Sequence, residues 1–161
     1  MIGTWLAAAR LCGAITATWP EVPPQRACVA AVAIEAERGA WSPSLVAAIA
    51  QHESRFEASR VNAALGACGP MQVVWSADRA TQDRRCARVR RDAWAGYRAG
   101  VRKLDQAVVD CERLGAPGLD CVLRVYAAGP GWRSAGAARA ASEFRALAAE
   151  LARRLPRGGE S

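Results

Sequence analysis

One carboxylate in this 161-residue chain has a setting that suits catalysis. Glu53 lies near the end of the stretch 42–56, in which apolar residues recur at helical spacing, namely Leu45, Val46, Ile49 and Phe56. A helical wheel places Glu53 between Val46 and Ile49, inside the apolar sector. A carboxylate there loses hydration, which favours the protonated form and suits the group to donate a proton to a leaving group. Glu53 is therefore a candidate general acid; the alternative is a glutamate at the helix edge, paired with a nearby arginine.

The residues before Glu53 predict how its helix begins. Ser42 provides an N-cap hydroxyl, and Pro43 at the first helical position has a preset φ and no N–H to leave unpaired. A preceding helix is expected over about 25–38, ending at Gly39 in the left-handed conformation. The side chains expected to face inward from that preceding helix are Cys28, Val29, Val32 and Ala36.

Two further motifs follow the Glu53-Ser54 pair along the chain. The first is Gly66-Ala67 with Gly69-Pro70-Met71-Gln72-Val73, and the second is Tyr126-Ala127-Ala128-Gly129-Pro130-Gly131. Together these motifs resemble the catalytic domain of soluble lytic transglycosylases (SLT-type), relatives of goose-type lysozyme that cleave peptidoglycan. The likeness runs from about Cys28 to Trp132, which is most of the chain.

The resemblance implies a role for each motif. Glu53 maps onto the family's catalytic acid, and Tyr126 maps onto a tyrosine that lies near the acid. In the family, a Gly-(Leu/Pro)-Met-Gln segment lines the sugar cleft. Ala127 stands where the family usually has Asn, so this chain lacks that amide. The candidates for substrate binding are accordingly Ser54, Gly69, Met71, Gln72 and Tyr126.

The same resemblance implies a reaction. A lytic transglycosylase cuts the β-1,4 bond between N-acetylmuramic acid and N-acetylglucosamine, with the muramic residue's own primary hydroxyl as nucleophile, and leaves an anhydromuramic end. No metal or cofactor is expected. Two alternatives stay open. One is a muramidase that uses water, with Asp78 as the first candidate for its base and Glu57 as another; the second is a catalytically idle wall-binding or virion structural protein of the same fold.

Composition favours a mainly α, lysozyme-like single domain. Hydrophobic residues make up 52% of the chain, but many are alanine and aromatics are only 6%, which suits helices packed closely through small side chains. A short extended or irregular segment, about Met71 to Trp75, is expected to line the sugar cleft. The expected divisions are an apolar N-terminal segment with a Pro-rich connector over 1–24, the lysozyme-like domain over 25–155 and a frayed tail over 156–161.

The N-terminal segment 1–15 is apolar and has two interpretations. It lacks a basic leader region and carries Arg10 within the apolar run, which is atypical of a signal peptide, and it is too short to span a membrane. A packing helix that stays in the mature protein is favoured, because helical spacing separates Ile2, Trp5, Leu6, Ala9 and Gly13.

The second half of the chain predicts three more helices. Asp92 is expected to cap a helix over Ala93–Arg113, and a shorter helix over Leu119–Ala128 carries Tyr126, whose hydroxyl would find a suitable partner in Glu53. A last helix is expected over about 137–155. The segment 81–91 holds five arginines and is expected to be a solvated basic surface loop; the alternative is a patch that anchors the protein to the wall.

Six cysteines predict three disulfides in an oxidising compartment. Zinc binding is not expected, because the chain has no C-x-x-C pair and one histidine. Short loops favour pairing of Cys111 with Cys121 and of Cys68 with Cys86, which would leave Cys12 with Cys28, although the sequence does not decide among the possible pairings. The alternative is a set of buried free thiols.

The charge of the chain predicts attraction to polyanions. There are 22 Lys and Arg residues against 15 Asp and Glu, a net charge of +7. No helix-turn-helix and no basic motif interleaved with aromatics stands out, so nucleic acid is not an expected partner. With the resemblance, the expected partners are peptidoglycan glycan strands and, further, a secretion apparatus or a phage particle. We expect the protein to be a monomer without a stable membrane span. Its expected location is the periplasm, the secreted fraction or a virion, where it could serve as an endolysin.

Overall fold

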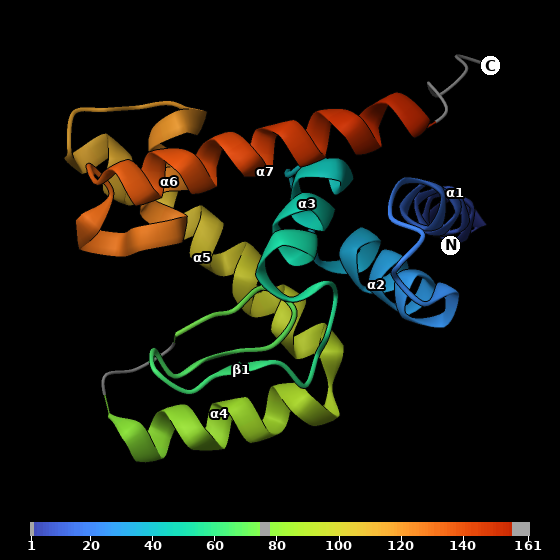
Figure 1. Cartoon of the computed structure of the whole chain (residues 1–161), viewed down its shortest axis with the longest axis horizontal. Coiled ribbons are helices and arrows are strands. Elements are labelled where there is room, and N and C mark those ends of the chain that lie inside the picture. Colours follow the sequence, from blue (N-terminus) through green and yellow to red (C-terminus); the bar gives the residue numbers. More distant parts are fainter. Residues whose placement is uncertain (1, 75–77, 156–161) are drawn as a thin grey trace.

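Helices make up most of the fold (Figure 1). The computed structural model describes residues 2–74 and 78–155, so Trp75 and the predicted tail 156–161 lie outside the described residues. In the described part the helices are α1 (Ile2–Thr18), α2 (Pro24–Glu37), α3 (Pro43–Ser54), α4 (Arg79–Arg91), α5 (Ala93–Arg113), α6 (Leu119–Ala128), the 3-10 turn η1 (Gly129–Gly131) and α7 (Ala135–Arg154). The strands β1 (Val61–Asn62) and β2 (Ala67–Cys68) pair antiparallel in a short hairpin. The predicted mainly α, lysozyme-like architecture is confirmed.

Helix α3 lies at the centre of the molecule, in contact with α2 and α7 (Figure 1). Ser42 caps it as predicted: its hydroxyl accepts a hydrogen bond from the backbone N–H of Leu45 at 3.2 Å, and Pro43 begins the first turn. Most residues of the helix are buried, which fixes its position. The helix ends where Arg55 adopts a left-handed conformation, with φ of 55°. Glu53 is thus held in the last turn of a helix that the core surrounds.

Helices α1 and α2 pack against each other and join the same core. Leu11 and Ile15 of α1 are fully buried, and α2 buries Ala27, Ala30, Ala31, Ala33 and Ile34. As predicted, α2 ends before Gly39, whose φ is +58°. The predicted inward face of α2 was wrong, because Val29 is 47% exposed and Cys28 also lies at the surface. Alanines allow close approach of neighbouring helices, and four of the five buried residues of α2 are alanine.

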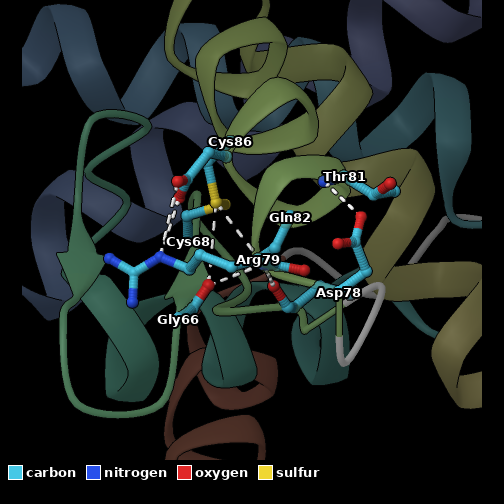
Figure 2. A network of polar contacts seen from close by, with 9 residues as sticks. Gly66, Cys68, Asp78, Arg79, Thr81, Gln82 and Cys86 are labelled. Carbon is cyan, nitrogen blue, oxygen red and sulfur yellow. Dashed lines mark hydrogen bonds and ion pairs between the residues drawn. A yellow bond between two sulfur atoms is a disulfide. The ribbon is translucent and has the colours of Figure 1, made fainter.

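The arginine-rich segment is helix α4 and not the predicted surface loop. Asp78 caps it, with its carboxylate accepting a hydrogen bond from the N–H of Thr81 at 2.8 Å (Figure 2). Gln82 donates to the carbonyl of Gly66 at 2.6 Å, and a disulfide joins α4 to β2 (Figure 2). One face of the helix is therefore buried against the hairpin, and its buried residues are Gln82, Cys86 and Val89.

Helix α5 begins and ends where the sequence predicts, and Asp92 caps it by accepting from the N–H groups of its first turn. Helix α6 also has the predicted bounds, whereas α7 begins at Ala135 instead of 137.

Gly100 of α5 leaves space for the side chain of Met71, because a Cβ at position 100 would overlap that side chain. This close approach brings the turn around Met71 against α5.

All six cysteines are paired, which confirms the prediction of three disulfides. The pairs are Cys12–Cys28, Cys68–Cys86 and Cys111–Cys121, the set that short loops favour. They join α1 to α2, β2 to α4, and α5 to α6. In the described part of the chain, no helix combines the length and the apolar character needed to cross a membrane.

Candidate active site

A cavity of about 480 Å³ lies beside the last turn of α3. Its walls come from α3, from the β1–β2 hairpin and its flanks, from α5 and from α6. The lining residues are Glu53, Arg60, Val61, Asn62, Ala63, Leu65, Ala67, Gln72, Val74, Lys103, Tyr126 and Ala127. Segments far apart in the sequence therefore meet here, and three of the predicted site residues are among them.

Glu53 faces this cavity and not the apolar core. Its side chain is 23% exposed, so the predicted location inside the apolar sector of α3 was wrong. The reason is its place in the last turn: Arg55 and Phe56 have positive φ values of 55° and 61°, so the helix stops just beyond Glu53. The carboxylate is accessible to a ligand, while the helix that carries it is fixed by the core.

His52 joins Glu53 to helix α7. Its Nε2 lies 2.7 Å from Oε2 of Glu143, and its Nδ1 lies 3.9 Å from Oε1 of Glu53. The imidazole ring also packs edge-on against Phe144, with ring centroids 4.9 Å apart. Interaction with the Glu53 side chain raises the pKa of His52, partial burial opposes this effect, and Glu143 raises the pKa further. The two carboxylates therefore favour the protonated imidazole.

A tight turn presents Gln72 to the cavity. The backbone N–H of Gln72 donates to the carbonyl of Gly69 at 3.2 Å, and Gly69 has a φ of +83°. Gln72 itself has a φ of 47°, which is uncommon for a residue with a side chain. Its amide nitrogen donates to the carbonyls of Gly69 and Arg60 at 2.9 and 3.1 Å. Among the described contacts its amide oxygen accepts no hydrogen bond, so this oxygen is the atom that a ligand can use.

The hydroxyl of Tyr126 forms its hydrogen bond with the turn. The predicted hydrogen bond to Glu53 is not formed. Its hydroxyl donates to the backbone carbonyl of Met71 at 2.7 Å. The ring is buried and packs edge-on against Phe144, with centroids 6.2 Å apart. Burial raises the pKa of Tyr126 well above its ordinary value, and the charge of Glu53 raises it further. Tyr126 is therefore a neutral hydrogen-bond donor that fixes the turn beside the cavity.

Three of the predicted substrate-binding residues lie behind the cavity wall: Ser54, Gly69 and Met71. The Ser54 hydroxyl donates to the carbonyl of Pro70 at 2.8 Å and accepts from the N–H of Glu57 at 3.0 Å. The Met71 side chain is fully buried against Gly100. These residues build the turn that orients Gln72, and their contact with substrate stays a prediction.

Lys103 also lines the cavity, although it belongs to none of the sequence motifs. It is the only lysine of the chain, and its ammonium lies 4.4 Å from the ring centroid of Tyr126. Burial lowers the pKa of Lys103, and the charge of Glu53 opposes that effect. One feature of the sequence does indicate that Lys103 is unusual. At helical spacing it shares a face of its helix with the buried Gly100 and Ala107, and a charged side chain on a buried face needs a polar partner.

Three large apolar side chains form an exposed rim at the cavity. Val61, Leu65 and Val74 are 44%, 70% and 45% exposed. Apolar groups that cluster at the surface around a pocket mark binding surfaces. The rim thus offers apolar surface beside the Glu53 carboxylate and the Gln72 amide.

Among the lining residues in the described chain, Glu53 is the only carboxylate. Asp78, the predicted base of a hydrolase, caps α4 and does not line the cavity; hydrogen bonds from Thr81 lower its pKa. Glu57 also lies outside the lining and accepts a hydrogen bond from the Ser59 hydroxyl at 2.9 Å. Neither alternative carboxylate is therefore placed beside Glu53. Within residues 2–74 and 78–155, no group of three or more His, Cys, Asp or Glu side chains is arranged to hold a metal ion.

Comparison with known proteins agrees with the expected family. The family described as Transglycosylase SLT domain matches residues 31–147, a range that includes α3, the hairpin, α5 and α6. Comparison with curated proteins and with solved structures gives no match. Since the family match covers most of the 161 residues, the chain belongs to the transglycosylase SLT domain family.

Proposed function

We propose that the protein is a lytic transglycosylase that cleaves the β-1,4 bond between N-acetylmuramic acid and N-acetylglucosamine. At the level of the family, the SLT domain acts on peptidoglycan. The observation that carries the finer proposal is the single carboxylate, Glu53, among the cavity-lining residues of the described chain. Glycosidases that use water or an enzyme nucleophile need a second carboxylate, whereas an internal nucleophile makes one sufficient.

Glu53 acts first as acid and then as base. It donates its proton to the glycosidic oxygen while the bond between that oxygen and the anomeric carbon of muramic acid breaks. The primary hydroxyl of the same muramic residue then attacks the anomeric carbon and gives its proton to the Glu53 carboxylate. Glu53 ends in the protonated form in which it began, and the product carries an anhydromuramic end. Proximity of the internal hydroxyl replaces the activation of a water molecule.

The groups beside Glu53 support glycan binding. The exposed rim of Val61, Leu65 and Val74 suits the C–H faces of sugar rings. The amide oxygen of Gln72 can accept from sugar hydroxyl or N-acetyl N–H groups. Lys103 brings a positive charge to the same cavity, and such a charge stabilises the Glu53 carboxylate between the two half-reactions.

A peptidoglycan-acting family and three disulfides together indicate an extracytoplasmic protein. For the setting we propose the periplasm, the secreted fraction or a virion. We propose residues 25–155 as the catalytic unit, with α1 as a helix that packs against it.

Product analysis tests the reaction. Digestion of purified peptidoglycan is expected to release muropeptides that end in anhydromuramic acid, each lighter by one water than a lysozyme product, as measured by mass spectrometry. Products that end only in reducing muramic acid would show a hydrolase. A complete lack of soluble products from the folded protein would support a catalytically idle wall-binding protein.

A matched pair of variants tests the role of Glu53. Glu53→Gln keeps the volume and removes the transferable proton, so activity should fall by at least about a hundredfold without loss of the fold. Glu57→Gln makes the same change outside the cavity and should keep most of the activity. Comparable losses in both variants, with unchanged melting temperatures, would contradict the assignment.

A further inference from the structure

Two arginines of α4, Arg85 and Arg88, line a second hollow that the proposed chemistry does not use. A groove of about 720 Å³ lies between α4 and α5. Its cationic lining residues are Arg85, Arg88, Arg98, Arg102 and Lys103, and no lining residue in the described chain is acidic. Positive charge concentrated in a hollow raises the local concentration of anions. The groove is therefore suited to an anionic ligand.

The side chains of three of these arginines have no polar partner in the described part of the chain. Arg98 is held by Glu37, with its Nη2 donating to Oε1 at 2.6 Å and its Nε donating to Oε2 at 2.9 Å. The side chains of Arg85, Arg88 and Arg102 are exposed, and none of these side chains forms an ion pair or hydrogen bond with another residue of the described chain. Their charges are therefore available to a ligand.

Helix α4 presents its arginines from a fixed position. The Cys68–Cys86 disulfide and the hydrogen bond from Gln82 to Gly66 join the helix to the hairpin, as Figure 2 shows. The same hairpin forms part of the Glu53 cavity. The groove and the cavity are thus joined through the same hairpin.

The groove also adjoins the Glu53 cavity. Val74 and Lys103 line both hollows. A polymer that occupies the cavity can therefore extend past Lys103 towards Arg102 and the arginines of α4. In peptidoglycan, the muramic residues of such a polymer carry peptide stems with free carboxylates.

We propose that this groove binds the carboxylates of the acidic peptide stems carried by the glycan strand in the adjoining cavity. The inference rests on the proposed function, because the strand in the cavity brings these carboxylates to the groove. Guanidinium groups match carboxylates in geometry and hydrogen-bond number. A separate phosphate polymer would not require that the groove and the cavity share residues.

A binding experiment tests the groove without relying on turnover. In a Glu53→Gln background, binding is measured to uncross-linked glycan strands with native stems, and to the same strands after conversion of the stem carboxylates to neutral amides. The triple variant Arg85→Gln, Arg88→Gln and Arg102→Gln should bind native strands about tenfold more weakly at low salt. Its binding to the amidated strands should equal that of the background protein.

Two further variants control for charge and for fold. The change of Arg26, Arg139 and Arg153 to Gln removes the same charge from exposed arginines that line neither hollow, and affinity should stay within about twofold. Replacement of the three groove arginines by lysine keeps the charge and should restore most of the binding. Circular dichroism verifies that each variant is folded.

The outcomes separate this proposal from others. Equal losses in the groove and control variants, or unchanged binding of native strands by the groove variant, would overturn it. A loss confined to a phosphodiester polymer such as teichoic acid would assign the groove to another ligand and would also overturn it. If the binding results hold but the protein with Glu53 intact releases no muropeptides, the proposed catalytic function fails and the groove assignment stands.

Discussion

The hydroxyl of Tyr126 donates a 2.7 Å hydrogen bond to the backbone carbonyl of Met71. The next residue, Gln72, has a left-handed φ and lines the cavity that also contains Glu53. Helix α6 therefore fixes a turn that lies far from it in the sequence. This bond explains how a buried tyrosine can act on the site through the position of Gln72.

Replacement of Tyr126 by Phe tests this relationship. The ring keeps its packing, but the buried carbonyl of Met71 loses its donor, which should lower the free energy of unfolding by about 1–3 kcal/mol. Release of soluble muropeptides should also fall, because the turn that orients Gln72 loosens. Denaturant unfolding and product release measure the two effects. A loss of stability with unchanged release would show that the bond supports the fold alone.

Local signals predicted α2, α3 and α5 well, because a residue that begins or ends each of these helices is recognisable in the sequence. Ser42 and Asp92 begin α3 and α5 as expected, and Gly39 follows α2 in the left-handed conformation. Helix α4 is not evident from the sequence, because its many arginines obscure the helical spacing of its buried residues, and because the caps of a helix and the carboxylate bases of an enzyme can both be aspartates such as Asp78. The charge of a segment thus concealed its periodicity.

The candidate site was predictable only in part. The motifs identify Glu53, Gln72 and Tyr126 as candidate site residues, and all three line one cavity. They did not reveal that Met71 points into the core, because its burial depends on Gly100 in a helix that comes later in the chain. Contributions such as Lys103 arise from tertiary packing, which the spacing within a motif does not encode.

The protonation of His52 should make stability depend on pH. The pKa of His52 is raised above its ordinary value of 6.5, first by Glu53 and further by Glu143, so the folded protein binds this proton more tightly than the unfolded chain. The stabilisation is therefore fully present below pH 6.5 and is lost as the pH rises through the raised pKa. Urea unfolding at a series of pH values should show this decline.

Glu143→Gln removes one of the carboxylates that raise the pKa of His52 and should make the decline smaller. His52→Gln should remove this contribution altogether. A decline of the same size in all three proteins would mean that another group titrates in this range.

Two disulfides of similar loop length allow a matched comparison. Cys68–Cys86 and Cys12–Cys28 join residues 18 and 16 positions apart, so each should stabilise the fold by about 2–4 kcal/mol. Only the first joins the cavity hairpin to α4. Replacement of either pair by serine should lower the melting temperature to a similar extent. Peptidoglycan cleavage, assayed where both variants are folded, should fall markedly only for Cys68→Ser with Cys86→Ser; equal losses would contradict this interpretation.

Lys103 is expected to lower stability and to support activity. Burial lowers the pKa of Lys103, although the charge of Glu53 opposes this, so the folded protein binds the lysine proton less tightly than the unfolded chain. The resulting cost to stability is present at neutral pH and is relieved as the pH rises through the lowered pKa.

Lys103→Met keeps a long apolar side chain over Tyr126 and removes the charge, so it should raise the melting temperature at neutral pH. Turnover of peptidoglycan should fall, because the carboxylate that forms when Glu53 donates its proton loses a neighbouring cation that stabilises it. Lys103→Arg retains the charge and should keep more activity than Lys103→Met. A Lys103→Met protein that is less stable and fully active would show that Lys103 serves packing and has no part in catalysis.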